Sequence, residues 1–413
     1  MAKPLTYQPL PDFGVNGLNT QNNPSTLDSS WLTKADNVVL RESGRISLRK
    51  GLKQKVVPTG TAIGSMIEHN DQGTNKIFAS YGTSIYTIDF TAPNTAFPSS
   101  GADVKHTVGS TTGDWQFVNF NNRLHCFHAG VIPQRYDGSL GSGVKWTAHA
   151  TDPASIATLF DPSCGMGFYG RIWCGGVAEA KDVVYYSNLL DGDDWTGGDT
   201  GLLDLSKVWG TDEVVAIAPF YGKLVIFGKN NIAIYNSPSV VGSLALDEVI
   251  SGIGCVSRDS VQAIGDDLVF LSETGLRSLA RTTEKDKLPL MDLSVNIKDT
   301  LIRNIGSSTN VKSVYVENEG IYIMSFVDKN VNYVFDFKHI TPNEVPRITT
   351  WSFDLDREPA SMIDTELYSG LLVGQKDGSI AGYEGYFDTD LAWVLSAASY
   401  TNDPFTADIS SIW

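Results

Sequence analysis

Short apolar runs separated by tight turns recur along most of the chain. Each unit reads as a short strand, a turn that contains Gly or Asn, a more apolar strand and then a further strand. When the first apolar residue after each turn is taken as an anchor, the anchors stand at positions 77, 124, 172, 224, 268, 321 and 371. Their separations are 47, 48, 52, 44, 53 and 50 residues, which indicates a repeat of about 49 residues.

A unit of this length has room for a small sheet of four short strands. Several of its strands, such as residues 223–227 and 320–326, are continuous apolar runs, which indicates sheets buried on both faces. A sheet of this size needs a neighbour on each side, and a radial array supplies one. The sequence therefore predicts an all-β protein, a β-propeller of six or seven four-stranded blades. A solenoid of stacked sheets is the alternative with the same period, but it fits the hairpin turns less well.

Three segments depart from the repeat. Residues 1–60 are rich in Asn, Ser and Pro and then basic, which predicts an extended N-terminal arm with a strand near residues 45–52. The propeller is expected over residues 61–390, followed by a C-terminal tail over 391–413. Within the propeller, residues 292–305 predict a short helix between two blades, with Ser294 as its N-cap.

Composition is that of an ordinary globular protein, with 42% hydrophobic residues and a mean hydropathy of -0.10. The first residues lack the charged and apolar regions of a secretory signal, and no window approaches the length of an apolar membrane span. We therefore expect neither export nor a membrane segment. The four cysteines, at positions 126, 164, 174 and 255, show no CxxC spacing and are expected to be buried free thiols.

Charge is distributed unevenly along the chain. Residues 1–60 hold eight Lys and Arg against four Asp and Glu, whereas the remainder holds 23 against 43. An acidic body argues against tight binding to a phosphate backbone, because such binding needs Lys and Arg. It is compatible with DNA that passes close by without sticking, and equally with solubility alone.

The residue patterns of common catalytic and metal sites are missing. The sequence has no Gly-rich phosphate loop, no GxSxG elbow and no HExxH motif. His125 and His128 are three residues apart on a predicted strand, so their side chains should point to opposite faces. The acidic loop from Asp191 to Trp195, with Asp199 beyond it, lacks the spacing of a calcium loop and is expected to be a solvated turn. We therefore predict no catalytic residue, no cofactor and no metal.

Two stretches resemble a known family. Residues 14–52 contain Gly17-Leu18-Asn19, Pro24, Ala35-Asp36-Asn37-Val38-Val39, Gly44-Arg45 and Arg49-Lys50-Gly51. Residues 252–279 contain a Ser-Val…Gly…Phe-Leu-Ser-x-x-Gly pattern. Both are similar to the β-propeller nozzle and hub proteins of short-tailed bacteriophages, which include packaged-DNA stabilisation proteins.

This resemblance implies a non-enzymatic structural protein of the virion, made in the host cytoplasm during assembly. It implies a ring of identical subunits, typically six, that docks beneath the portal and its adaptor. DNA passes through the lumen without sequence-specific binding, and fibres, spikes or a needle attach to the ring. The arm is expected to make contacts outside its own propeller. The docking residues predicted for contacts with neighbouring subunits or the adaptor are Leu18, Asn19, Asn37, Arg45, Arg49 and Lys50.

Other classes of propeller remain open at this stage, because the fold does not decide the function. A glycan-binding or sialidase-like propeller is the main alternative, since residues 187–195 contain a faint Ser…Asp-Gly…Trp pattern. A sialidase also needs several arginines that converge on the substrate carboxylate. The candidate arginines are Arg135, Arg171, Arg258 and Arg277, and nothing in the sequence indicates that they converge. A cellular scaffold propeller that binds protein partners without forming a ring is a further alternative.

Overall fold

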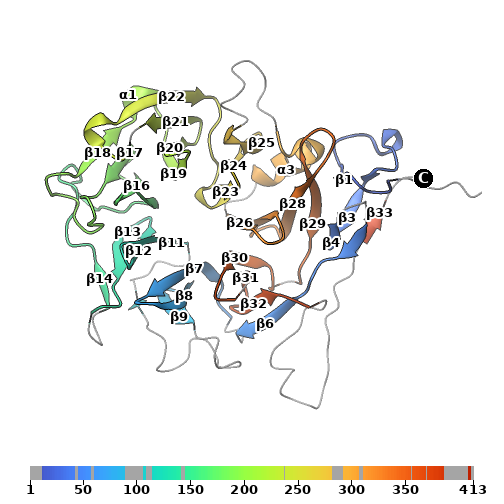
Figure 1. Ribbon diagram of the computed structural model, residues 1–413, viewed down its shortest axis with the longest axis horizontal. Coiled ribbons are helices and arrows are strands. Elements are labelled where there is room, and N and C mark those ends of the chain that lie inside the picture. The colour runs from blue at the N-terminus through green and yellow to red at the C-terminus, as the bar shows by residue number, and fades with distance from the viewer. Residues whose placement is uncertain are drawn as a thin grey trace, which may run out of the picture.

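The strands form sheets that stand around a common axis (Figure 1). The computed structural model describes residues 12–41, 45–56, 60–88, 106–107, 114–140, 145–236, 238–280, 292–306, 310–354, 356–368, 370–385 and 408–410. In these residues the sheets make seven blades, which confirms the predicted propeller and sets its blade number at seven. The solenoid alternative is wrong.

Each blade begins with its innermost strand, since these first strands contact one another around the axis. Blade 1 consists of β7 (Ile63–Asp71), β8 (Thr74–Tyr81), β9 (Ser84–Ile88) and β10 (His106–Thr107). Blade 2 consists of β11 (Gln116–Phe120), β12 (Arg123–His128), β13 (Val131–Tyr136) and β14 (Trp146–Ala148). Blade 3 consists of β15 (Cys164–Phe168), β16 (Arg171–Val177), β17 (Ala180–Tyr186) and β18 (Gly201–Asp204). Blade 4 consists of β19 (Val214–Phe220), β20 (Lys223–Gly228), β21 (Asn231–Asn236) and β22 (Ala245–Ser251). The short helix α1 (Ser206–Trp209) and the 3-10 turn η3 (Val241–Ser243) belong to this part of the chain.

The second half of the ring follows the same plan. Blade 5 is β23 (Gln262–Ile264), β24 (Asp267–Ser272) and β25 (Gly275–Ser278), preceded by the 3-10 turn η4 (Arg258–Ser260). Blade 6 contains β26 (Val311–Val316), β27 (Ile321–Phe326), β28 (Val331–Ile340) and β29 (Pro346–Trp351), and blade 7 contains β30 (Pro359–Thr365), β31 (Gly370–Gln375) and β32 (Ile380–Tyr383). All seven anchors of the sequence repeat lie on the second strand of a blade, from β8 to β31.

The fourth strand of blade 7 comes from the other end of the chain. Strand β6 (Leu52–Val56) pairs antiparallel with β32, and the register sets Leu52 opposite Tyr383 and Val56 opposite Ile380. The N-terminal segment therefore closes the ring. The predicted boundary at residue 60 is corrected by this pairing, because β6 is part of the propeller.

Apolar side chains fill the spaces between neighbouring blades. The described residues form seven hydrophobic clusters, for example one in which Val225, Phe227 and Ile234 of blade 4 pack against Leu268 and Phe270 of blade 5. Such contact on both faces explains why these strands are continuous apolar runs.

The rest of the described arm folds onto blades 5 and 6. Its elements are β1 (Gly17–Leu18), η1 (Pro24–Thr26), β2 (Trp31–Leu32), β3 (Lys34–Asp36), β4 (Val38–Leu40) and β5 (Ile46–Leu48). Strand β3 extends blade 6 beyond β29, and β33 (Asp408–Ser410), near the C-terminus, pairs with β3. Apolar arm residues, including Leu32 and Val38, join the core cluster of blades 5 and 6. The described arm is therefore not a free extension. Apart from β33, the predicted C-terminal tail lies outside the described residues.

The predicted helix is present between blades 5 and 6. It consists of a 3-10 turn, η5 (Val295–Ile297), followed by α3 (Lys298–Ile305), whose Leu301 and Ile305 are buried. Ser294 stands at the predicted N-cap position of η5, but its side chain makes no capping hydrogen bond. Its hydroxyl instead accepts a hydrogen bond from the Leu276 N–H and donates one to Asp292 Oδ1, which holds the chain against β25.

Two further expectations concern the whole chain. All four cysteines are buried and free, as predicted. No helix in the described part of the chain combines the length and the apolar character needed to span a membrane.

Candidate functional site

Four of the six predicted docking residues are buried inside the chain's own fold. Arg49 is fully buried, donates from Nε to Asn37 Oδ1 at 2.9 Å, and lies 4.8 Å from the centre of the Phe353 ring. The amide of Asn37, a residue with a φ of 57°, donates to Ser352 Oγ at 2.9 Å. Asn37 and Arg49 therefore clamp the arm to the end of β29, and their side chains are not free to meet a partner.

Leu18 and Asn19 also support the arm itself. Leu18 belongs to the core cluster of blades 5 and 6. Asn19 Oδ1 accepts hydrogen bonds from the backbone N–H groups of Gln21 and Asn22, at 3.0 Å each. Gly17, with a φ of 83°, lies where a Cβ would be 2.9 Å from the Ile348 carbonyl oxygen, so the close approach of arm and blade requires glycine here.

The two remaining predicted residues reach the surface. Arg45 is exposed beside the β4–β5 hairpin. Lys50 is partly exposed, and its Nζ lies 2.5 Å from Glu319 Oε1. For Arg45 and Lys50 the docking role remains a prediction.

An ionic network joins four blades at the axis of the propeller, and three of its four side chains are mostly buried. Asp259, in η4 before blade 5, accepts from Lys312 Nζ of blade 6 at 2.7 Å and lies 3.3 Å from Arg258 Nε. Arg258 also pairs with Asp114, just before blade 2, at 3.1 Å and donates to the Ser163 carbonyl oxygen just before blade 3. Lys312 contacts Asp114 as well. We name these four side chains, Arg258, Asp259, Lys312 and Asp114, the axial network.

The electrostatics of the axial network favour the charged forms of Asp259 and Lys312. Burial alone would raise the pKa of Asp259, but Lys312 and Arg258 lower it to about 2. Burial alone would lower the pKa of Lys312, but Asp259 and Asp114 raise it. Beside the network lies a cavity of about 180 Å³ lined by the first strands of five blades. A second cavity of about 410 Å³ is also lined by Asp114, Arg258 and Asp259, so the charged side chains of the network narrow the axis.

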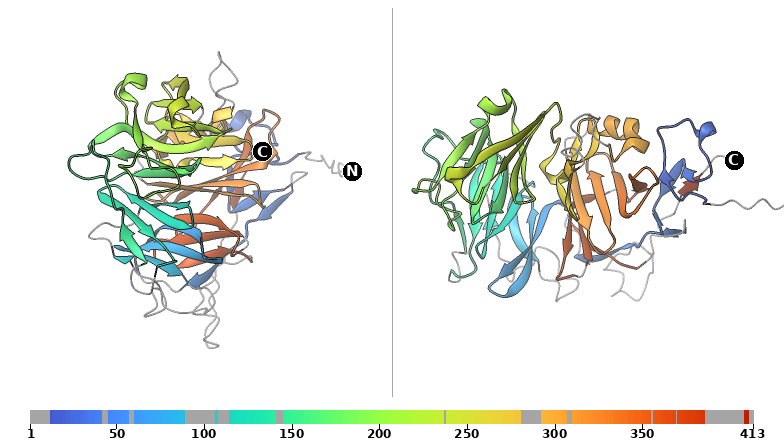
Figure 2. Two further views of the ribbon diagram at one scale, coloured as in Figure 1. Left: turned by 60° about the vertical axis from the view of Figure 1, so that its left-hand side comes forward. Right: turned by 45° about the horizontal axis from the view of Figure 1, so that its top comes forward.

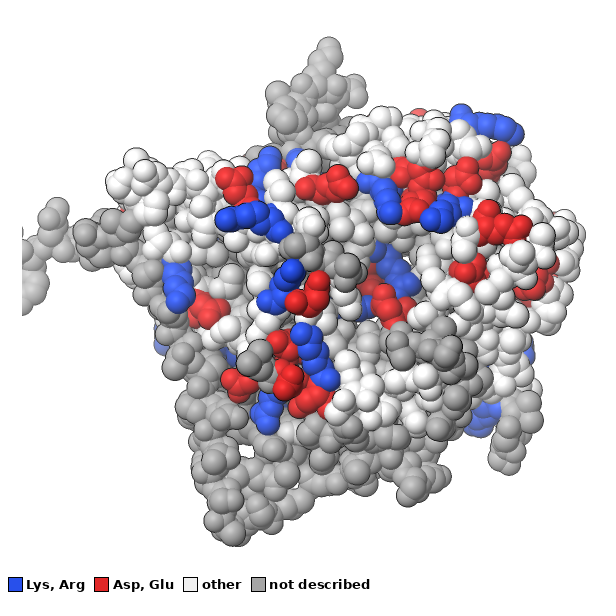
Figure 3. Space-filling view, turned by 180° about the vertical axis from the view of Figure 1, so that it is seen from behind, with Lys and Arg blue, Asp and Glu red and all other residues white. Residues whose placement is uncertain are grey.

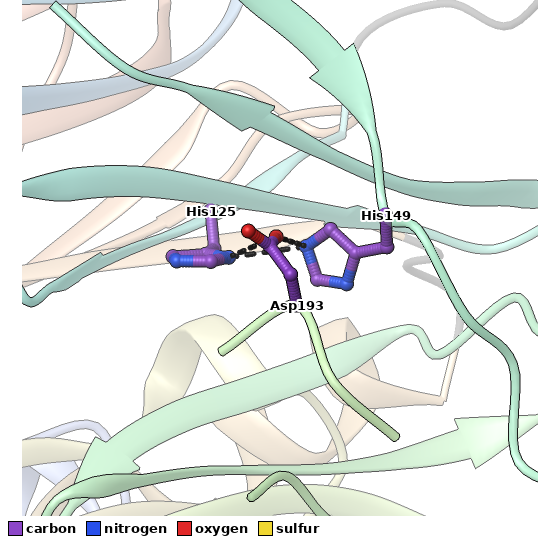
Figure 4. Close-up of side chains that lie close together, drawn as sticks. All are labelled: His125, His149 and Asp193. Carbon is purple, nitrogen blue, oxygen red and sulfur yellow. Dashed lines mark hydrogen bonds and ion pairs between the residues drawn. The ribbon is translucent and has the colours of Figure 1, made fainter. Parts of the chain in front are cut away.

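A second buried cluster joins blades 2 and 3 (Figure 4). It consists of His125 on β12, His149 directly after β14, and Asp193 in the loop between β17 and β18. His125 Nδ1 is 3.0 Å from His149 Nε2, and Asp193 Oδ1 is 3.7 Å from His149 Nε2 and 4.0 Å from His125 Nδ1. Ligands around a tetrahedral zinc ion would be about 3.4 Å apart, since Zn–N bonds are about 2.0–2.1 Å. The spacing alone is therefore compatible with a metal.

The protonation of the cluster does not fit a metal. The Trp195 indole Nε1–H donates to His149 Nδ1 at 3.0 Å, and an indole nitrogen is a donor only. Burial, with a contribution from Arg135, lowers the pKa of His149 to about 3, so the ring is neutral and its one proton lies on Nε2. That nitrogen faces His125 Nδ1 and has no lone pair for a cation. The cluster is therefore a set of hydrogen bonds that links blade 2 to blade 3.

Two guanidinium groups hold the Asp193 side chain in this cluster. Its Oδ2 accepts from Arg135 Nη1 and, at 3.3 Å, from Arg123 Nη1. The expectation of a solvated turn is therefore wrong for Asp193 and Trp195, which are buried, although Asp191 and Asp199 are exposed. His125 and His128 do not come together, as predicted, since His128 contacts the Ala129 carbonyl and the Trp115 ring. Sequence reasoning missed His149, because no spacing relates it to His125.

We expect Asp193→Ala to lower the free energy of unfolding by about 2 kcal/mol or more, because Arg135 loses its charged partner in a mostly buried site. Chemical denaturation measures the change. Asp199→Ala, in the same loop but 64% exposed, is the matched control and should cost less than about 0.5 kcal/mol. Equal effects of the two substitutions would contradict the role assigned to Asp193.

The arginines required by a sialidase-like site each have separate partners. Arg135 pairs with Asp193, Arg171 donates to the carbonyl oxygens of Ser187 and Asp199, and Arg258 belongs to the axial network. Arg277, on β25, donates to Thr274 Oγ1. The four lie in different parts of the ring and do not converge on one pocket.

Charge on the face opposite to that of Figure 1 is mixed. Figure 3 shows Lys and Arg side chains interspersed with Asp and Glu over this face, without a broad basic area among the residues it colours. Such a surface is not one that binds a nucleic-acid backbone strongly.

Comparison with known proteins adds evidence on the fold. No protein-family model and no curated protein matches the chain in sequence. Among solved structures, it is similar to the extracellular domain of a protein named as a one component system of B. thetaiotaomicron, with a TM-score of 0.51 and 12% sequence identity. The match covers 89% of this chain and 50% of that chain, so this chain spans about half its length. At this identity the similarity shows a shared propeller fold alone.

Proposed function

We propose that the protein is a non-enzymatic structural subunit of the tail of a short-tailed bacteriophage. Copies of it form a ring that continues the channel of the portal and adaptor, helps to retain the packaged genome and passes DNA on ejection. Fibres, spikes or a needle attach to this ring. The proposal rests on the resemblance of residues 14–52 and 252–279 to nozzle and hub proteins, together with the features below.

The arm is the observation that carries the proposal. Residues of its family-like pattern, Gly17, Asn37 and Arg49, are the ones that fix it to blade 6. The arm therefore has a defined place, and its β4–β5 hairpin lies at one end of the long axis of the molecule (Figure 1). A fixed lateral extension on a compact body is a suitable element for a head-to-tail ring.

The narrow axis supports a lumen formed between copies. The axis holds an ionic network and cavities of about 180 and 410 Å³, which are too small for a duplex to pass through the propeller itself. Any channel for DNA must then lie between subunits. The mixed charge of Figure 3 also supports transit of DNA without tight binding.

The test is electron microscopy in negative stain, with mass photometry, of the purified full chain alone and mixed with portal–adaptor rings. We expect closed rings with a central channel that dock beneath the adaptor. Monomers that never dock would contradict the proposal and would favour the glycan-binding alternative, which a glycan array would then examine.

A further inference from the structure

Two hairpin tips carry tyrosine where the backbone favours asparagine or glycine. The turns Tyr169-Gly170 of blade 3 and Tyr221-Gly222 of blade 4 have φ values of 48° and 72°, and of 46° and 75°. Positive φ at both central positions is the type I′ geometry, which Asn and Gly adopt most readily. A bulky residue in this region costs roughly 1–2 kcal/mol. Blade 2 has Asn121-Asn122 at the same place, with φ values of 51° and 58°.

The tyrosines belong to an apolar patch. The tip patch consists of Tyr169, Leu189, Leu190 and Tyr221, which are 46%, 48%, 62% and 68% exposed. A Cβ built on Gly170 would lie 3.1 Å from Leu189 and 3.3 Å from Leu190, and one on Gly222 would lie 3.2 Å from the Tyr169 hydroxyl, so the patch is continuous. Exposed aromatic side chains on strained turns are typical anchors of protein contacts.

The surroundings of the tip patch are acidic. Residues 164–251, which form blades 3 and 4, hold five Lys and Arg against eleven Asp and Glu. Asp191 and Asp199, in the same loop as Leu189 and Leu190, are exposed. A partner of this surface should therefore be basic and carry an apolar side chain.

The other end of the molecule carries basic side chains and an exposed apolar side chain. Residues 1–60 carry twice as many basic as acidic residues, eight against four. Arg41, directly after β4, and Arg45, directly before β5, are exposed, and Leu48 on β5 is 44% exposed. Blades 3 and 4 and the arm lie at opposite ends of the molecule in Figure 1 and in the right-hand view of Figure 2.

We propose that the tip patch of one copy binds the β4–β5 hairpin of the next copy. A closed ring of identical subunits needs two unlike surfaces on opposite sides of each subunit, and these two are complementary in charge and each exposes apolar side chains. This inference rests on the proposed ring function and names the contact that forms the ring. It also gives Arg45 a partner surface that includes Asp191 and Asp199.

The experiment uses two full-length variants, each defective in one surface. Tyr169→Asn/Tyr221→Asn removes the aromatic anchors and should leave the melting temperature unchanged or raised, because Asn accepts positive φ. Arg41→Glu/Arg45→Glu reverses the charge of the hairpin. Each variant alone should associate at least about 100-fold more weakly than the wild type. Mixed in equal amounts they should form a dimer and nothing larger, since only one intact pair of surfaces remains. Leu367→Asn, a 48% exposed apolar residue of blade 7, is the control and should form rings normally.

The outcomes separate this inference from the proposed function. If the wild type forms rings and the tyrosine variant does so equally well, or if the mixture yields no dimer, the contact is wrong and the ring function stands. If the wild type forms no rings with or without the adaptor, the proposed function itself fails, and the inference with it.

Discussion

Asp259→Ala is expected to lower the free energy of unfolding by about 3 kcal/mol, because it removes the less exposed of the two carboxylates shared by Lys312 and Arg258, which are mostly buried. Asp114 still contacts both groups, but its side chain is 53% exposed and its charge is screened by solvent. Denaturant unfolding of the full chain measures the loss. Asp266→Ala, an exposed carboxylate at the β23–β24 turn, should change stability by less than about 0.5 kcal/mol.

A double substitution measures the coupling between Asp259 and Lys312. Asp259→Ala/Lys312→Met removes both opposite charges, so we expect its cost to be smaller than the sum of the two single costs. Additive costs would show that the axial network is not a coupled unit and would contradict its role in narrowing the axis.

Acid should weaken the same network. The pKa of Asp259 is about 2 in the folded protein, against about 3.9 in an unfolded chain. Its contribution is therefore complete above about pH 4 and is lost as the pH falls towards 2. The pKa of Lys312 is raised, so its contribution is present below its unfolded value of about 10.4 and is lost only as the pH rises through the folded value.

Lys53→Pro is expected to destabilise the protein by about 1 kcal/mol or more, because proline removes a backbone donor from β6, the strand that completes blade 7. Glu384 N–H donates to the Gly51 carbonyl, so alternate residues of β6, Lys53 among them, face β32. An open ring exposes the apolar faces of blades 7 and 1, so proteolysis should begin there. Lys53→Ala is the matched control, since it removes the side-chain ion pair with Glu384 but keeps the backbone N–H. If the proline variant unfolds like the alanine variant, β6 is not needed for closure.

This role of β6 limits how the arm can be tested. Deleting residues 1–60 would remove β6 together with the docking candidates, and loss of rings would then report an opened propeller. Point variants at Arg41 and Arg45 examine docking without this effect, since both side chains are exposed.

The local pattern of the sequence was enough to predict the propeller. Each blade is built mainly from consecutive strands joined by short turns, so the period of the anchors from residue 77 to residue 371 carries the architecture directly. The same holds for the short helix before blade 6 and for the buried cysteines. Two-sided burial of the strands could also be predicted, because it appears as continuous apolar runs.

Only the tertiary structure decided which distant residues meet. Closing the ring brings β6 to β32 and Lys312 to Asp114, and the packing of blade 2 on blade 3 brings His125 to Asp193. No spacing in the sequence relates these pairs. The tertiary structure also turned Arg49 and Asn37 from surface candidates into an internal clamp. The physical reason is that most strand pairs within a blade join near neighbours along the chain, whereas the β6–β32 pair, the ionic contacts and the clamp depend on how separate blades and the two ends of the chain meet.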